Sequence, residues 1–76
     1  MSIEVKFFAS LREKTGKHTA EVDAASVSTV ANVWQQCVDE AMPTNTLMAV
    51  NMEYVSAEHT VKDGDEVAFF PPVTGG

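Results

Sequence analysis

Few side chains in this sequence could carry out a reaction by themselves. The two histidines, His18 and His59, lie far apart in polar stretches and do not suggest a shared site. The single cysteine, Cys37, falls among apolar residues at helical spacing, where a thiol usually serves as a small hydrophobic group. The acidic segment 63–66 is more typical of a turn than of a metal site. Glycine-rich phosphate loops and zinc-ligand spacings are also missing, so we expect no catalytic residues, no metal and no permanently bound cofactor.

The best candidate for a reactive group is the carboxylate at the end of the sequence, which follows two residues without side chains, Gly75 and Gly76. Glycine lets a backbone pass through a channel too narrow for a Cβ atom. The uncharged tail 71–76 (PPVTGG) reaches roughly 20 Å when extended. Its two prolines stiffen the base. The tail would form a thin rod with a carboxylate at its tip, although the dipeptide alone would better fit a frayed terminus.

Length and charge narrow the class of protein. The 76 residues suffice for a single domain over 1–76, which we divide into a globular body (1–70) and a tail. The net charge of −6 argues against nucleic acid or an anionic membrane surface as a partner. Residues 1–17 carry four basic and two acidic side chains, whereas residues 18–76 carry one basic and nine acidic ones. Such an acidic body fits a basic protein partner or a plain solvated face. Without a signal peptide or membrane-spanning run, we expect a cytoplasmic protein.

Alternation of apolar and polar residues predicts a sheet of short strands. The polar segment 11–17, which holds Gly16, is expected to be the turn between the first two strands. The predicted strands are 3–8, 18–22, 47–50, a brief one at 54–55, and 66–70.

A single amphipathic helix is predicted from about residue 29 to residue 41. Ser28 or Thr29 can cap its first turn, and Pro43 disfavours helix at its end. One helix on one face of a mixed sheet, with the last strand returning beside the first, indicates an α+β fold of the β-grasp type. The apolar stripe of the helix consists of Val30, Val33, Trp34, Cys37, Val38 and Ala41.

Strand parity separates the two faces of the predicted sheet. Phe8 and Phe70 point away from the helix, and Tyr54 is expected to join them in an exposed apolar patch suited to docking. The side chains expected to meet the helix are Ile3, Val5, Phe7, Val67 and Phe69.

The motif of highest specificity is the ending 62–76 (KDGDEVAFFPPVTGG), supported by VKFFA at 5–9 and AVN at 49–51. With these motifs the chain resembles the ubiquitin-like sulfur carriers, most closely the family of molybdopterin synthase small subunits. The resemblance covers the whole chain in length, element order and ends. Carriers of the thiamine pathway share the fold and the Gly-Gly end but tend to lack the Phe-Phe-Pro-Pro stretch.

The resemblance implies that Gly76 carries sulfur in molybdenum cofactor biosynthesis. An adenylyltransferase similar to the ubiquitin-activating class would use ATP to adenylate Gly76, and a sulfur donor protein would supply the sulfur of a thiocarboxylate. The large catalytic subunit of molybdopterin synthase would receive that sulfur on a pterin precursor, in an expected complex of two small and two large subunits. We expect Gly75, Thr74 and Val73 to let the tail enter the active site of a partner. The residues expected to bind partners are Phe8, Tyr54, Phe70, Pro71 and Pro72.

Other functions would use the same features. A sulfur carrier for thiamine thiazole synthesis, or a ubiquitin-like protein modifier, would present the same tail to a different acceptor. A β-grasp interaction module that carries nothing would have an incidental Gly-Gly end.

Overall fold

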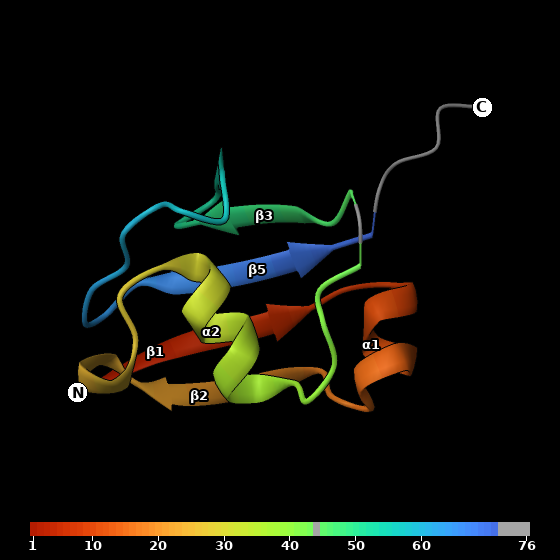
Figure 1. Ribbon diagram of the computed structural model, residues 1–76, viewed down its shortest axis with the longest axis horizontal. Coiled ribbons are helices and arrows are strands. Elements are labelled where there is room, and N and C mark those ends of the chain that lie inside the picture. Colours follow the sequence, from red (N-terminus) through yellow and green to blue (C-terminus); the bar gives the residue numbers. More distant parts are fainter. Residues whose placement is uncertain (44, 72–76) are drawn as a thin grey trace.

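The computed structural model describes residues 1–43 and 45–71 as one mixed sheet with helices beside it (Figure 1). The strand order is β2-β1-β5-β3-β4; β1 and β5 run parallel, and every other neighbouring pair is antiparallel. The elements are β1 (Ser2–Phe7), α1 (Ser10–Thr15), β2 (Thr19–Asp23), a 3₁₀ turn (Ala24–Ser26), α2 (Val30–Cys37), β3 (Leu47–Val50), β4 (Glu53–Val55) and β5 (Glu66–Phe70).

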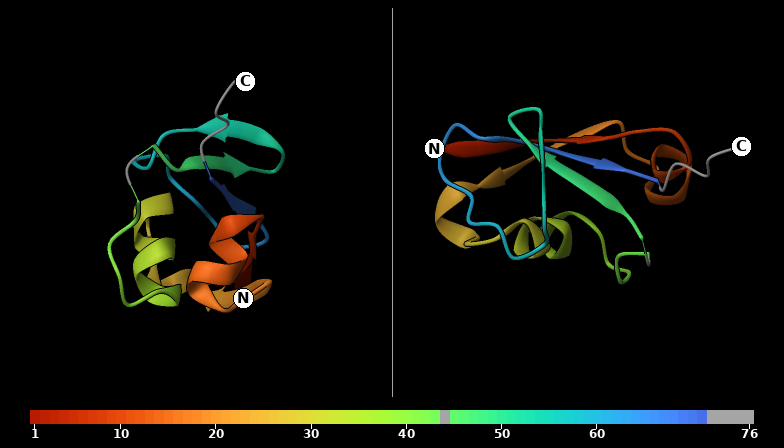
Figure 2. Two further views of the ribbon diagram at one scale, coloured as in Figure 1. Left: turned by 90° about the vertical axis from the view of Figure 1, so that its right-hand side faces the viewer. Right: turned by 90° about the horizontal axis from the view of Figure 1, so that it is seen from above.

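The predicted β-grasp arrangement is confirmed. The hairpin of β1 and β2 leads into α2, which lies against one face of the sheet, and β5 returns beside β1 (Figure 2). Each predicted strand is present to within about one residue at either end. No helix of residues 1–43 and 45–71 covers the other face of the sheet, so side chains on that face can meet solvent or a partner.

The prediction of a plain turn over residues 11–17 was wrong, because this segment contains the short helix α1. Its Arg, Glu and Lys residues are good helix formers, and Leu11 is buried against the core. One apolar residue in a single turn and a half leaves no periodicity to detect. Gly16 ends α1 in the left-handed conformation (φ 73°), and its N–H donates to the carbonyl of Arg12 at 2.9 Å.

The main helix begins as predicted but is shorter than predicted. Thr29 caps it: its hydroxyl accepts the Asn32 N–H at 3.3 Å, and the Asn32 side chain accepts the Thr29 N–H at 3.2 Å. The helix ends at Cys37 rather than at 41, because Val38 is extended (φ −132°). The chain then folds back over the indole of Trp34, whose N–H donates to the carbonyl of Glu40 at 2.7 Å.

Trp34 is the centre of the core. Its ring meets Phe7 and Phe69 edge-on, with centroid distances of 5.9 Å and 5.0 Å, and its exposed fraction is 2%. The five strand side chains expected to face the helix are all buried: Ile3, Val5, Phe7, Val67 and Phe69. The parity prediction for the inner face is therefore confirmed.

We predict that Trp34→Ala lowers the free energy of unfolding by about 3–5 kcal/mol, because it removes a buried ring that contacts Phe7 of β1 and Phe69 of β5. Thermal or denaturant unfolding of the purified chain measures the loss. Gln35→Ala on the exposed side of α2 is the matched control and should stay within about 0.5 kcal/mol of the parent. Equal stability of the two variants would contradict this placement of the core.

Candidate functional site

The outer face of the sheet brings Phe8 and Phe70 together. The parallel register pairs Phe7 with Phe69, so the residues one position further on share the opposite face. The two rings stack with centroids 4.8 Å apart and an interplanar angle of 7°. The N–H of Phe8 also donates to the carbonyl of Phe69 at 3.1 Å, which holds the end of β1 against β5.

Tyr54 joins these rings, as the sequence predicted. It stands opposite Ala49 in the β3–β4 pair, and its ring lies 6.1 Å from that of Phe70 at an angle of 60°. Tyr54 is 72% exposed and Phe8 38% exposed. Phe8, Tyr54 and Phe70 therefore form an outer aromatic patch on a face that no helix covers.

The structure adds Met52 to this surface, a residue that sequence reasoning missed. A groove of about 320 Å³ lies on the outer face, and Met52 lines it together with the outer aromatic patch. The predicted strands 47–50 and 54–55 left Met52 in the connection between them, without a role. An apolar residue at a turn position that usually favours glycine was the available signal. The complete lining is Lys6, Phe8, Ala49, Met52, Tyr54, Glu66, Ala68 and Phe70.

The tail begins directly beside the outer aromatic patch. Pro71 follows Phe70 at the end of β5 and is half-buried. This end of β5 lies at the same end of the molecule as α1 (Figure 1). The remaining predicted tail residues lie outside the described residues, and their roles stay predictions: Pro72, Val73, Thr74, Gly75 and Gly76.

An ion pair stands in the middle of the outer face. Lys6 Nζ lies 2.8 Å from Glu66 Oε2, with both side chains partly exposed. The hydrogen bond and the charge of Glu66 raise the pKa of Lys6 above its usual value. The same bond and the charge of Lys6 lower the pKa of Glu66, so both groups are charged at neutral pH.

The candidate nucleophile and bases do not gather into a site. Cys37 is buried on α2, and burial raises the pKa of its thiol although the charge of Lys17 opposes the shift. His18 is exposed and contacts Arg12 (Nε2 to a guanidinium nitrogen, 3.1 Å). His59 is exposed in the loop before β5. Cys37 acts as a packing residue, as the sequence indicated.

The acidic segment 63–66 contains the predicted turn at Asp63 and Gly64, and its last residue, Glu66, begins β5. The buried carboxylate of Asp65 accepts the Asn51 side-chain N–H at 3.0 Å and the Lys62 backbone N–H at 2.9 Å. Within residues 1–43 and 45–71, no three metal-ligating side chains converge. Nor does any helix in this part of the chain have the length and apolar character needed to cross a membrane.

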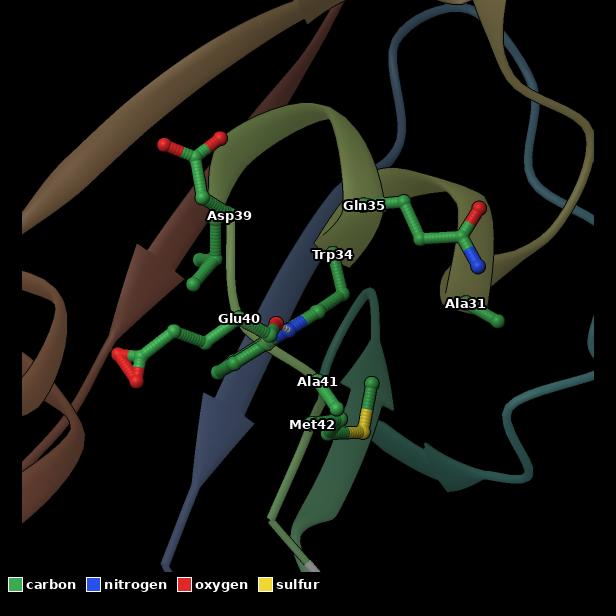
Figure 3. Close-up of a pocket in the computed structure, with 8 residues that line it drawn as sticks. Ala31, Trp34, Gln35, Asp39, Glu40, Ala41 and Met42 are labelled. Carbon is green, nitrogen blue, oxygen red and sulfur yellow. Dashed lines mark hydrogen bonds between the residues drawn. The ribbon is translucent and has the colours of Figure 1, made fainter.

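A second hollow, of about 410 Å³, lies on the other side of the molecule between α2 and residues 38–42 (Figure 3). It surrounds the hydrogen bond from the Trp34 indole to Glu40. The carboxylates of Asp39 and Glu40 point away from the indole. Residues 38–42 close the end of α2 over the core, and the hollow is the space that remains between this segment and the helix.

A five-stranded mixed sheet in this order, with one main helix on one face, defines a ubiquitin-like β-grasp protein. The model of the ThiS family matches residues 5–76. The molybdopterin synthase sulfur carrier subunit of Escherichia coli is 46% identical, over 97% of this chain and 99% of that protein. The corresponding subunit of Haemophilus influenzae is 35% identical over the same shares. The chain therefore belongs to the ThiS family.

The solved structures agree with this fold. Small archaeal modifier protein 1 of Haloferax volcanii superimposes with a TM-score of 0.79 at 28% identity, covering 95% of this chain and 98% of that protein. The likeness extends over practically the whole length of both chains.

We predict that the depressed pKa of Glu66 depends on Lys6. Lys6→Met should move the Glu66 carboxyl back up towards its ordinary value, as measured by a carbon-detected NMR titration. Because the folded-state pKa is lowered, the stabilisation by this pair is present above the unfolded value near 4.5 and is lost as the pH falls through the folded value. Lys14→Met on α1 is the control and should leave Glu66 unchanged; an equal shift in both variants would contradict the assignment.

Proposed function

We propose that this chain is the sulfur carrier of a molybdopterin synthase and serves molybdenum cofactor biosynthesis. One observation carries the proposal: the 46% identity to the E. coli sulfur carrier subunit spans 97% of this chain. The position of the outer aromatic patch supports it, because a docking surface beside Pro71 would aim the tail into the partner that it contacts.

The proposed chemistry takes place at Gly76. A carboxylate is ionised at neutral pH and is a poor electrophile. An adenylyltransferase of the ubiquitin-activating type would let one carboxylate oxygen attack the α-phosphorus of ATP, with release of pyrophosphate. Sulfur at the oxidation state of hydrosulfide, supplied by a donor protein, would then attack the acyl carbon. AMP would leave with the carboxylate oxygen that is bonded to its phosphorus. The product is a thiocarboxylate, and Gly75 allows the tip to reach the reacting groups.

Delivery requires a second partner. The large synthase subunit would bind the outer aromatic patch, admit residues 71–76 to its active site and present the pterin precursor to the sulfur. Two sulfurs are needed for one dithiolene, so the carrier dissociates and is recharged between transfers. The proposed assembly holds two small and two large subunits. The same patch would serve the activating enzyme, since one tail has to enter both partners.

A protein-modifier role is the second candidate. It is favoured by the likeness to small archaeal modifier protein 1, which covers 95% of this chain at 28% identity. Such a modifier would use the activated Gly76 to acylate a lysine of another protein. Analysis of cell extracts for Gly76 joined to lysine side chains separates the two roles.

We predict that sulfur loading depends on Gly76. In the presence of ATP, the activating enzyme and a sulfur donor, intact-protein mass spectrometry should show the mass increase for replacement of one oxygen by sulfur. Deletion of Gly76, or addition of one residue after it, should abolish the increase and leave thermal unfolding unchanged. Cys37→Ser and His59→Ala are controls that should still be loaded. Full loading of a chain without Gly76 would overturn the proposed function.

We predict that Phe70→Ala weakens binding to both the activating enzyme and the large synthase subunit. Truncation of an aromatic anchor at the centre of an interface typically costs about 2 kcal/mol or more. Phe70 lies on the outer face and is partly exposed, so the thermal midpoint should change little. Titration calorimetry with each partner measures the effect, and Phe69→Leu in the core is a control that should affect stability before binding. Unchanged affinity of Phe70→Ala for both partners would contradict the shared patch.

A further inference from the structure

The groove on the outer face has a floor of two small side chains. Ala49 of β3 pairs directly with Ala68 of β5. The same row continues to Tyr54 on β4 and to Lys6 on β1. Cross-strand partners share a face of the sheet, so these four side chains stand side by side on the face away from α2. Two alanines between two long side chains leave the depression of about 320 Å³.

Taller side chains enclose this floor. Phe70 lies two positions after Ala68 on β5 and closes the end nearest the tail. Glu66 lies two positions before Ala68 and closes the other end. Ala49 is 5% exposed whereas Tyr54 is 72% exposed, so the floor is recessed and the wall on the β4 side stands free. The groove is therefore a hollow with a small-residue floor and not a flat apolar surface.

The groove carries no net charge. Of the residues that line it, Lys6 and Glu66 are charged, and they form an ion pair of 2.8 Å with each other. The backbone N–H of Glu66 is bonded to the Asn51 side chain at 3.0 Å. Among residues 1–43 and 45–71, no buried side-chain nitrogen or oxygen lacks a hydrogen-bond partner. The lining therefore suits an occupant that brings neither a charge nor a hydrogen-bonding group.

Met52 stands beside this floor on the β3–β4 turn. Asn51 and Met52 are the two central residues of that turn, with φ of 51° and 72°. Glycine is preferred at the second position, and a side chain there is strained. Met52 is 90% exposed, so packing within this chain does not offset the strain. A flexible thioether that lines an apolar groove and stays exposed suits contact with a partner.

We propose that the groove receives one aliphatic side chain of the large synthase subunit, of about the size of leucine or methionine. This inference rests on the proposed function and names a contact within it. The incoming side chain would rest on the methyl groups of Ala49 and Ala68. The rings of Phe70 and Tyr54 would flank it, and Met52 would cover it. Since the groove borders the outer aromatic patch, the two would form one continuous docking surface.

Other side chains fit this groove less well. A cationic or an anionic side chain would compete for one member of the Lys6–Glu66 pair and leave the other without its partner, which is costly once water is excluded. An amide side chain would be buried against a floor that offers it no hydrogen bond. A flat aromatic ring suits a narrow slot, whereas this floor spans two strands. An aliphatic side chain fills such a hollow and needs no polar partner.

The first test fills the groove. Ala68→Leu should weaken binding of the purified large subunit about tenfold, as measured by biolayer interferometry on the full chain, because its side chain takes the space of the incoming one. Ala41→Leu is the matched control: it adds the same side chain at an exposed position after α2 and should bind as the parent does.

Thermal unfolding shows whether the filled variant is folded. Should Ala68→Leu fail to fold, Ala68→Val is measured in its place and should bind about threefold more weakly than the parent. Affinity of the filled variant equal to or above that of the parent overturns the inference, because a flat apolar contact would gain from the added surface.

The second test addresses charge. Lys6→Met should weaken binding about fivefold, because Glu66 is then left without its partner beneath the docked subunit. The double variant Lys6→Met/Glu66→Gln removes both charges and should recover most of that loss. Lys14→Met removes the same charge on α1, outside the groove, and should change the affinity less than about twofold. Tighter binding of Lys6→Met overturns the inference, because it would indicate a cationic occupant.

The third test identifies the occupant. With Met52 replaced by the photocrosslinker p-benzoylphenylalanine, mass spectrometry of the illuminated complex should locate the contacted segment of the large subunit. One aliphatic residue of that segment, changed to alanine, should weaken binding of the parent but should not weaken binding of Ala68→Leu further. Absence of a crosslink, or additive losses for every aliphatic residue of the segment, overturns the inference.

The outcome is separable from that of the proposed function. Sulfur loading of Gly76 is measured on the parent chain with the activating enzyme and without the large subunit. A parent chain that loads, combined with failure of the three tests, refutes the groove contact and leaves the carrier function standing. A parent chain that does not load refutes the carrier function itself.

Discussion

The parallel pairing of β1 with β5 is the interaction on which the rest of this structure depends. It sets Val5 beside Val67 and Phe7 beside Phe69 in the centre of the sheet, although these residues are about sixty positions apart in sequence. Because both strands alternate, inward side chains of β1 lie beside inward side chains of β5, and outward ones beside outward ones. A shift of the register by one residue would send Phe7 outwards and Phe8 into the core. Core and docking face are thus two results of one register.

The core of this small domain is covered by one main helix, so few side chains must supply most of the buried apolar surface. A chain of 76 residues has little apolar surface to bury, and α2 contributes eight residues to covering one face of the sheet. Trp34 compensates for this short helix, because one large ring contacts the aromatic residues of both central strands. The outer face then contributes less to stability than the core does, since its aromatic side chains are only partly buried or exposed. Aromatic side chains on that face are therefore available for binding.

The hydrogen bonds around Asp65 connect that free face to the end of the sheet. Its buried carboxylate joins Asn51, at the hairpin turn, to Lys62, in the loop before β5. A carboxylate in such a place is kept because two N–H groups satisfy it. The network fixes where the turn stands relative to Glu66, and so it helps to position Met52 and Glu66, which line the groove. A residue with no exposed role of its own thereby positions residues of the surface.

Alternation and helical spacing in the sequence determined the strands, the inward side chains and the placing of Phe8 and Phe70 on one face. They could do so because successive side chains of a strand point to opposite faces whatever the strand pairs with. The Gly-Gly ending and its flanking motif determined the family. The tertiary structure alone decided the rest. α2 ends where Val38 becomes extended and the chain crosses the Trp34 indole, and α1 buries Leu11 in the core. The groove depends on strands brought together from distant parts of the chain, a contact that no local pattern encodes.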